Sequence, residues 1–326
     1  MNALLDATRR VEQGHFWWRG LRSFVRPLVA EALAGTPAPR ILDCGCGTGA
    51  NLVVLGEYGR TFGFDFSLDG LNYARSYGQT RIAHASITHI PFGDATFDLV
   101  TVFDVLYSLN EEQEAAAVAE AFRVLRPGGA LIVNVAALSI LRGQHSVFGG
   151  EVRRSTRRRL RALLSRHGFD VRRLTYTNAS LFPLMLVVRT TQRIVGLATP
   201  EEAGTDVAMP PAPVNWLLSA LVWCEARALR VTDMPIGSSL LCMARRPAAA
   251  ELARSSGHSR QAQAHQKPQG DPVGERADDG RGHRGSDDKS RRERRDEIAG
   301  ALPELGAVNP QSHQLVETPA DVGRDR

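Results

Sequence analysis

The sequence predicts an α/β protein with a doubly wound parallel sheet. From about residue 40 to residue 245, segments of strand character alternate with segments of helical periodicity, as expected when helices cover both faces of such a sheet. The first apolar strand runs into a glycine-rich turn at residues 43–49, Asp-Cys-Gly-Cys-Gly-Thr-Gly. The 326 residues are 43% hydrophobic, which is sufficient for one large domain with a full core.

Seven strands are expected, together with five helices and two further helices in an insertion between the last two strands. The strands are placed at residues 40–44, 61–65, 81–85, 97–103, 130–135, 169–176 and 239–245. The helices are placed at residues 21–33, from 50 onward, and at 67–77, 111–125 and 156–167. Asn110 is a suitable N-cap for the helix at 111–125. Gly168 is a suitable C-terminal stop for the helix at 156–167.

Composition divides the chain into three parts. Residues 1–39 are expected to form an N-terminal helical lid, and residues 40–246 the main domain, with an insertion at about 179–235. Residues 247–326 contain no Phe, Trp or Tyr, so they bury too little apolar surface to offset their conformational entropy, and we expect a disordered tail. That tail holds 13 basic and 14 acidic side chains, so the net positive charge lies in residues 1–246.

The glycine turn is suited to close contact with a small molecule. Gly45, Gly47 and Gly49 can adopt positive φ and bring backbone N–H groups close to a ligand. Residues 45–50 also fit the pattern G-x-G-x-x-A of dinucleotide-binding folds, so the turn alone leaves a nicotinamide-dependent oxidoreductase open. An ordinary turn that happens to use glycine is the remaining alternative.

Three downstream features decide between these ligands. The second strand ends in an acid at Asp65, the strand 97–103 continues into Asp104-Val-Leu-Tyr-Ser, and Pro127-Gly-Gly leads into the fifth strand. In this order and spacing the chain resembles the class I S-adenosylmethionine-dependent methyltransferases, in the broad group that includes ubiquinone and menaquinone methyltransferases. A His15-Phe-Trp-Trp segment is similar to one in a bacterial subfamily whose substrates are undefined. The resemblance covers roughly residues 10–246.

The resemblance implies a Rossmann-like sheet of seven strands whose last strand is antiparallel, and S-adenosylmethionine as cofactor. Asp43 would face the ammonium group of the cofactor, and the glycine turn with the following helix its carboxylate. Asp65 would bind the ribose hydroxyls, with a helix cap as its alternative role, and Phe66 would lie against adenine. The full predicted set of cofactor contacts is Asp43, Gly45, Cys46, Gly47, Gly49, Asp65, Phe66, Ser86, Ile87, Phe103 and Asp104.

Two positions depart from the pattern of the family. Ser86 stands where an acidic residue commonly holds the adenine amino group, so adenine would depend on the Ser86 hydroxyl and the backbone near Ile87. Ser108 stands where relatives often carry His, which removes one candidate base. These departures keep a catalytically inactive, cofactor-binding module open as an alternative to the enzyme.

Three residues are candidates for the catalytic step, which must align the nucleophile and deprotonate it if it is a hydroxyl. His15 and His145 ordinarily titrate near neutrality, and Tyr107 follows the fourth strand. His15 has packing in the lid as its alternative role, and Tyr107 is equally able to orient the acceptor or to pack. The acceptor itself is expected to be a small or lipid-linked molecule methylated at oxygen.

The insertion is expected to contribute to the acceptor site. Residues 181–195 and 214–229 carry apolar stripes at helical spacing, separated by a proline-rich loop at 210–213. We expect these helices to close over the carboxyl ends of the strands with the His15-Phe-Trp-Trp segment. A larger core or a dimer contact is the alternative, so the chain is expected to be a monomer or a homodimer.

Charge and cysteine content limit the other partners. An arginine-rich stretch at 153–161 could meet nucleic acid, an anionic lipid surface or a phosphorylated substrate, or be a solvated helix face. No aromatic residues interleave with these arginines, so no clear nucleic-acid partner is indicated, and peripheral membrane contact stays open. Cys44, Cys46, Cys224 and Cys242 show no metal-binding spacing. With no apolar leader or spanning segment evident, a cytoplasmic protein is expected.

Overall fold

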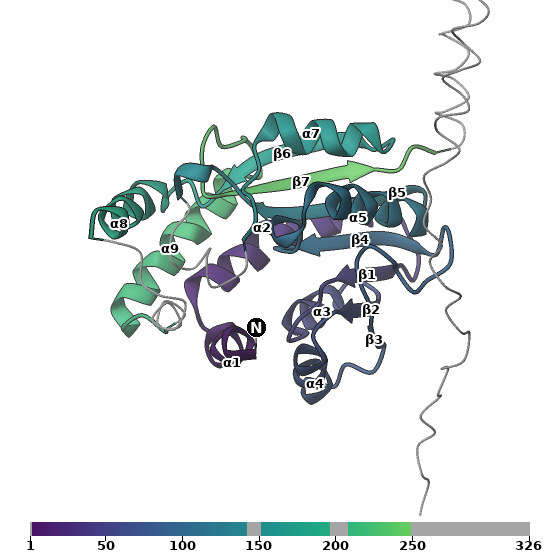
Figure 1. The fold of residues 1–326 in the computed structure, drawn as a ribbon, viewed down its shortest axis with the longest axis horizontal. Coiled ribbons are helices and arrows are strands. Elements are labelled where there is room, and N and C mark those ends of the chain that lie inside the picture. The colour runs from purple at the N-terminus through teal and green to yellow at the C-terminus, as the bar shows by residue number, and fades with distance from the viewer. Residues whose placement is uncertain (1, 142–150, 196–207, 249–326) are drawn as a thin grey trace, which may run out of the picture. The chain divides into compact units, whose positions relative to one another are not determined.

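The computed structural model of the chain describes residues 2–141, 151–195 and 208–248 (Figure 1). Their core is a sheet of seven strands in the order β3-β2-β1-β4-β5-β7-β6, in which β7 is antiparallel to both of its neighbours. The strands are β1 Arg40–Cys44, β2 Arg60–Asp65, β3 Ile82–His84, β4 Phe97–Phe103, β5 Leu125–Ala136, β6 Asp170–Thr177 and β7 Ser239–Arg245. The predicted fold class, including the antiparallel last strand, is confirmed. The predicted tail begins at residue 247, and its residues from 249 onward lie outside the described part of the chain.

Helices cover both faces of the sheet. They are α1 Asn2–Val11, α2 Phe16–Ala32, α3 Ala50–Leu55, α4 Leu68–Ser76, α5 Glu111–Val124, α7 Arg157–Arg166, α8 Phe182–Val195 and α9 Ala212–Ala228, with 3-10 turns η1 Leu106–Ser108 and η2 Ser139–Leu141. As predicted, Asn110 caps α5, in a capping box with Gln113, and Gly168 follows α7 with φ of 85°. Among the residues described, no helix has both the length and the hydropathy that crossing a membrane requires.

Alternation along the strands divides the core into two layers. Leu42 packs in a cluster with α5 and α7, whereas its neighbour Ile41 packs in a cluster with α2 and α9 (Figure 1). The second layer is tight, because a Cβ atom on Gly20 of α2 would lie 2.4 Å from Cγ1 of Val222 on α9. The helix α2, which lies within the predicted lid 1–39, therefore packs in the core.

Two elements begin earlier in the chain than predicted. The helix α2 starts at Phe16 rather than Leu21, because His15 caps it. The strand β5 starts at Leu125 rather than Ala130, since Leu125 already pairs with Phe97 before an irregularity in the ladder. Pro127-Gly-Gly lies within that irregularity. Gly128 has φ of 84° and donates its N–H to the carbonyl oxygen of Arg246, 2.8 Å away, so the predicted turn is absorbed into the sheet.

Candidate functional site

The glycine turn between β1 and α3 is held in a conformation that only glycine adopts readily. Gly45, Gly47 and Gly49 have φ of 75°, 50° and 80°. A Cβ atom on Gly45 would lie 2.4 Å from Cγ2 of Val105, just after β4, so the turn and the end of β4 are in close contact. The turn therefore lies at the carboxyl ends of β1 and β4. Ligands bind at this edge in doubly wound sheets.

Several N–H groups of this turn are already used inside the protein. Those of Gly45 and Cys46 both donate to the carbonyl oxygen of Phe64, at 2.9 and 3.0 Å. The N–H of Gly47 donates to Oδ2 of Asp65 at 2.7 Å. The sequence led us to expect donors for a ligand here, but these three bonds instead fix the shape of the turn against β2.

Asp65, at the end of β2, is held rigidly beside the turn. Its Oδ2 accepts from Gly47, and its Oδ1 accepts from the N–H of Ser67 at 2.7 Å. The N-cap of α4 is Ser67, whose hydroxyl accepts from the N–H of Gly70. The capping role that we considered for Asp65 therefore falls to Ser67, and the carboxylate of Asp65 is oriented at the turn by two charge-assisted bonds.

Asp43, the second-to-last residue of β1, is almost fully buried, with 1% of its surface exposed. Its Oδ1 accepts from the hydroxyl of Thr101 at 2.7 Å, while its Oδ2 has no hydrogen-bond partner among the described residues. Burial raises the pKa of this carboxyl to about 7. A buried carboxylate oxygen without a partner is suited to a cationic donor, so the site fits the ammonium group of a bound amino acid moiety.

This pKa predicts pH-dependent cofactor binding. A cationic ligand prefers the ionised carboxylate, so affinity for S-adenosylmethionine should rise up to tenfold per pH unit below about pH 7 and level off above it. Titration calorimetry from pH 5.5 to 8.5 measures this. Asp43→Asn should bind weakly with a flat profile. A profile that stays steep in Asp43→Asn would assign the pH dependence to another group.

The end of the site predicted for adenine is more open. The side chain of Phe66 is 69% exposed, with its ring 5.9 Å from that of His84. The hydroxyl of Ser86 lies 2.8 Å from that of Thr88, and Ile87 is buried in the core layer of α5 and α7. Phe66 is thus available to a flat ligand, whereas Ser86 is engaged in its own turn.

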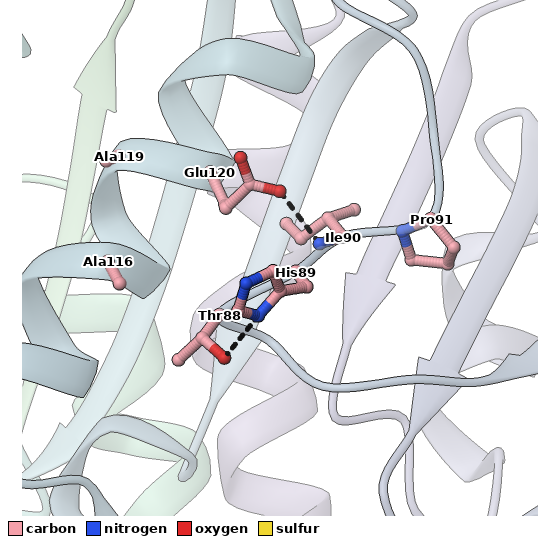
Figure 2. Close-up of a pocket in the computed structure, with 7 residues that line it drawn as sticks. All are labelled: Thr88, His89, Ile90, Pro91, Ala116, Ala119 and Glu120. Carbon is pink, nitrogen blue, oxygen red and sulfur yellow. Dashed lines mark hydrogen bonds between the residues drawn. The ribbon is translucent and has the colours of Figure 1, made fainter. Parts of the chain in front are cut away.

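A shallow pocket lies next to this region (Figure 2). It is lined by Thr88, His89, Ile90, Pro91, Ala116, Ala119 and Glu120. Glu120 accepts from the N–H of Ile90 at 2.8 Å and pairs with Arg123 at 2.7 Å, which lowers its pKa. Its carboxylate therefore fixes the loop to α5, and none of the residues predicted to bind the cofactor lines the pocket.

A buried polar cluster lies at the carboxyl ends of β4 and β5. Asp104 has φ of 56°, a conformation that few residues other than glycine adopt. Its N–H donates to the carbonyl oxygen of Asn134 and its Oδ1 accepts from Nδ2 of Asn134, both at 2.9 Å. Burial raises the pKa of Asp104 to about 7. Phe103, predicted to contact the cofactor, is instead buried in the core layer of α2 and α9.

Tyr107 and a buried ion pair complete this cluster. Burial, followed by the charges of Asp104 and Glu151, raises the pKa of the Tyr107 phenol. Glu151 accepts from Nε of Arg154 at 2.8 Å, with both side chains at least nine-tenths buried. The carbonyl oxygen of Tyr107 accepts from the N–H of Val152, which ties η1 to this segment. The phenol is thus a neutral hydrogen-bond donor at physiological pH.

His15 occupies a structural position. Its Nδ1 accepts from the N–H of Trp17 at 3.1 Å, and its ring stacks on Phe16 with centroids 4.4 Å apart. Burial lowers its pKa, which favours the neutral ring. With Nδ1 used as acceptor, the neutral ring carries its proton on Nε2, so this geometry favours the packing role over that of a base. His145, the other candidate, lies outside the described residues.

The N-terminal helix α1 is tied to the glycine turn. Oε2 of Glu12, the residue directly after α1, accepts from the buried hydroxyl of Thr48 at 2.7 Å, and Oε1 accepts from Tyr77 after α4 at 3.3 Å. Leu5 of α1 approaches Gly47 as well. The part of the predicted lid that reaches the turn is therefore α1.

The arginine-rich stretch is largely used in internal contacts. Arg153 and Arg159 both pair with Glu114 of α5, and Arg154 pairs with Glu151. Arg157 donates to the carbonyl oxygen of Met234 and lies over the ring of Tyr176. The open surface that we considered for an anionic partner is thus reduced to Arg158 and Arg161, which are exposed on α7. The stretch is mainly an attachment of α7 to α5.

The cysteines show no sign of metal binding. Cys44, Cys46 and Cys242 are buried and Cys224 is exposed, with no disulfide among them. Burial raises the pKa of all three buried thiols, that of Cys242 to about 12. Within the described residues, no group of three or more potential metal ligands gathers.

Sequence patterns predicted the glycine turn and its carboxylates more completely than the side chains that surround them. Asp43, the glycines, Asp65 and Asp104 meet at the carboxyl ends of β1, β2 and β4. Asn134, Glu151 and Glu12 were missed, and Arg154 was predicted only as part of the arginine-rich stretch 153–161. Asn134 had a detectable signal, because it is the only polar residue in the apolar run 130–137, but the partners of the other three are not evident from the sequence.

Comparison with known proteins places this site in context. Residues 42–133 match the family described as a methyltransferase domain. A "probable S-adenosylmethionine-dependent methyltransferase" of Mycolicibacterium smegmatis is 32% identical over 37% of this chain and 45% of its own length. A demethylmenaquinone methyltransferase of Renibacterium salmoninarum is 36% identical over 33% of this chain and 46% of its own. The chain thus spans about half the length of the curated relatives it matches.

Solved structures give a weaker likeness. An S-adenosylmethionine-dependent methyltransferase from Thermotoga maritima superposes with a TM-score of 0.46 at 16% identity, covering 74% of this chain and 94% of its own. A structure of PH0226 from Pyrococcus horikoshii has a TM-score of 0.43 at 22% identity, covering 50% of this chain and 86% of its own.

Proposed function

We propose that this chain, whose residues 42–133 match the family described as a methyltransferase domain, is a class I S-adenosylmethionine-dependent methyltransferase that transfers a methyl group to a small or lipid-linked acceptor at oxygen. The observation that carries the proposal is Asp104. It is a half-buried carboxyl just after β4, next to the glycine turn, and desolvation raises its pKa to about 7. Such a group is suited to take a proton from a hydroxyl at neutral pH.

The cofactor half of the site would be formed by three features. Oδ2 of Asp43 would accept from the ammonium group, Asp65 would accept from the ribose hydroxyls, and the exposed ring of Phe66 would lie against adenine. When bound, the cofactor supplies an activated methyl group on a sulfonium. The tight contact of Gly45 with Val105 brings this half of the site directly beside the acceptor half.

The acceptor half would be formed around Asp104. As the acceptor oxygen bonds to the methyl carbon and the carbon–sulfur bond breaks, the proton of the acceptor hydroxyl would pass to the carboxylate of Asp104. Asn134 would keep the carboxylate in place through its two bonds, and the Tyr107 phenol would donate a hydrogen bond to orient the acceptor. In this proposal Asp104 is a base for the acceptor rather than a contact of the cofactor.

The insertion supports an apolar acceptor. Figure 1 shows α8 and the first half of α9 beyond the carboxyl ends of the parallel strands, on the same side as α1. The side-chain amide of Asn215 on α9 donates to the carbonyl oxygen of Gly14 at 3.0 Å and accepts from the N–H of Phe16 at 2.9 Å. These bonds join the insertion to the His15-Phe-Trp-Trp segment. In this proposal the insertion and this segment would form one wall of the acceptor site, and an apolar wall would suit a hydrophobic acceptor and exclude water.

Asp104→Asn tests the proposal. The variant keeps the shape of the side chain and its bond from Asn134 but cannot accept the proton, so methyl transfer should fall about 10²- to 10⁴-fold while cofactor affinity changes little. The assay follows radiolabelled methyl from S-adenosylmethionine into aqueous and organic fractions of a bacterial extract. Asp98→Asn, at the other end of β4, is the control and should retain activity.

Two other outcomes would contradict parts of the proposal. Full activity in Asp104→Asn would remove the base assigned here. Tight cofactor binding by the unmodified chain, with no methyl transferred into any fraction, would instead support the inactive, cofactor-binding module.

A further inference from the structure

The helix α9 is apolar on nearly its whole circumference, yet only one side of it is packed. In its carboxyl half Val222 and Ala226, with Leu229 directly after the helix, are buried in the core layer that α2 shares, and Glu225 is buried as well. The remainder of the helix surface exposes Val214, Trp216, Leu217, Leu221 and Trp223. A helix that is apolar all round ordinarily has every side covered, so this face is incomplete by itself.

The neighbouring helix α8 continues the pattern. It exposes Leu184, Val187 and Val188, so α8 and α9 together hold eight of the sixteen large apolar side chains that are exposed in the described residues. We refer to these eight residues as the α8–α9 apolar surface. The connecting residues 196–207 lie outside the described part of the chain and do not belong to it.

This surface is firmly mounted on the domain. Glu225 accepts from the backbone N–H groups of Ala179 and Ser180, both at 2.9 Å, and so fastens the start of α8 to α9. Asn215 fastens the other end of α9 to Gly14 and Phe16. The apolar side chains therefore cannot turn inward without breaking these hydrogen bonds.

The charges and aromatic residues around the surface identify its partner. Glu225 is the only acidic residue in α8 and α9, and it is buried, so the exposed charge in the described part of these helices is arginine. Arg227 lies over the ring of Trp223, 5.4 Å from its centroid, and Arg230 follows α9 as an exposed side chain. Exposed tryptophans flanked by arginines are typical of helices that lie in the interface of an anionic bilayer.

We propose that the α8–α9 apolar surface docks on an anionic lipid bilayer, with Trp216 and Trp223 entering the interface and Arg227 and Arg230 facing the lipid headgroups. This inference concerns binding to a surface and does not depend on methyl transfer. It would bring the carboxyl ends of the strands, where the acceptor is proposed to bind, close to the membrane (Figure 1).

Vesicle sedimentation with the full chain tests the proposal. Binding is expected to vesicles of phosphatidylglycerol and phosphatidylcholine, and binding to phosphatidylcholine alone should be at least tenfold weaker. Trp216→Ser/Trp223→Ser should reduce binding to anionic vesicles about tenfold or more. Arg227→Gln/Arg230→Gln should reduce it several-fold and remove the preference for anionic lipid. Val53→Ser/Leu68→Ser removes two exposed apolar side chains elsewhere, on α3 and α4, and should bind as the unmodified chain does.

Separate measurements keep folding and self-association apart from lipid binding. Every variant should retain its affinity for S-adenosylmethionine, which shows that the domain is folded. If the unmodified chain ignores anionic vesicles, or if Trp216→Ser/Trp223→Ser binds them fully, the proposal is wrong. Sedimentation velocity tests self-association. If the unmodified chain is a dimer, Trp216→Ser/Trp223→Ser is a monomer and vesicles are not bound, the proposal is also wrong, because the surface then contacts a second copy of the chain.

Discussion

Asp65→Ala is expected to weaken the binding of S-adenosylmethionine by about 10- to 100-fold. The variant loses a charge-assisted bond to the ribose hydroxyls, which contributes about 1.5–3 kcal/mol. It also leaves the N–H groups of Gly47 and Ser67 without the carboxylate that now holds them, so the glycine turn loses its link to β2. Both effects act in the same direction, and titration calorimetry measures their sum.

Asp69→Ala is the matched control for this variant. Asp69 is an acidic side chain in the first turn of α4, only four residues from Asp65, and no cofactor contact is predicted for it. Asp69→Ala removes the same charge from the protein and from the N-terminus of α4 as Asp65→Ala does. The affinity for S-adenosylmethionine should nevertheless stay within about threefold of that of the unmodified chain. Unchanged affinity in Asp65→Ala, with the fold intact by circular dichroism, would show that the ribose lies elsewhere.

Glu114→Ala is expected to lower the free energy of unfolding by about 2–3 kcal/mol. Glu114 is 3% exposed and pairs with Arg153 at 3.0 Å and with Arg159, so the variant leaves two half-buried guanidinium groups without their carboxylate. Breaking a fully buried pair costs about 3–5 kcal/mol, and the partial exposure of both arginines places this case at or below that range. Urea unfolding measures the change.

The neighbouring Glu112 supplies the control for this second variant. It lies in the same first turn of α5 but is exposed, so Glu112→Ala should change stability by less than about 0.5 kcal/mol. Equal losses in the two variants would assign the effect to the charge at the helix terminus. No loss in Glu114→Ala would show that the two arginines are adequately solvated without it.

The contrast between Asp65 and Glu114 shows which features can be read from the sequence. The strand, the glycine turn and Asp65 lie within about 25 residues, so local patterns located them. The partners of Glu114 lie 39 and 45 residues away, and an arginine-rich segment is equally compatible with an external anion and with an internal carboxylate. Only the packing of α7 against α5 decides between the two.

The acceptor half of the site depended on tertiary structure for the same reason. Asp104 could be located at the end of β4 but not oriented, since its partner Asn134 lies on the next strand. His15 was recognised as part of an aromatic segment, but its role as N-cap depends on the exact start of α2, which local patterning placed five residues too late.

The burial of three cysteines leaves the chain with a single site for thiol chemistry. Cys44, Cys46 and Cys242 are inaccessible and their raised pKa disfavours the reactive thiolate, whereas Cys224 is exposed on α9. A maleimide fluorophore should therefore label the natural sequence once, between Trp223 and Glu225. Its emission would report the polarity around α9 directly, so the encounter of this helix with lipid, acceptor or another chain could be followed in real time without any engineered cysteine.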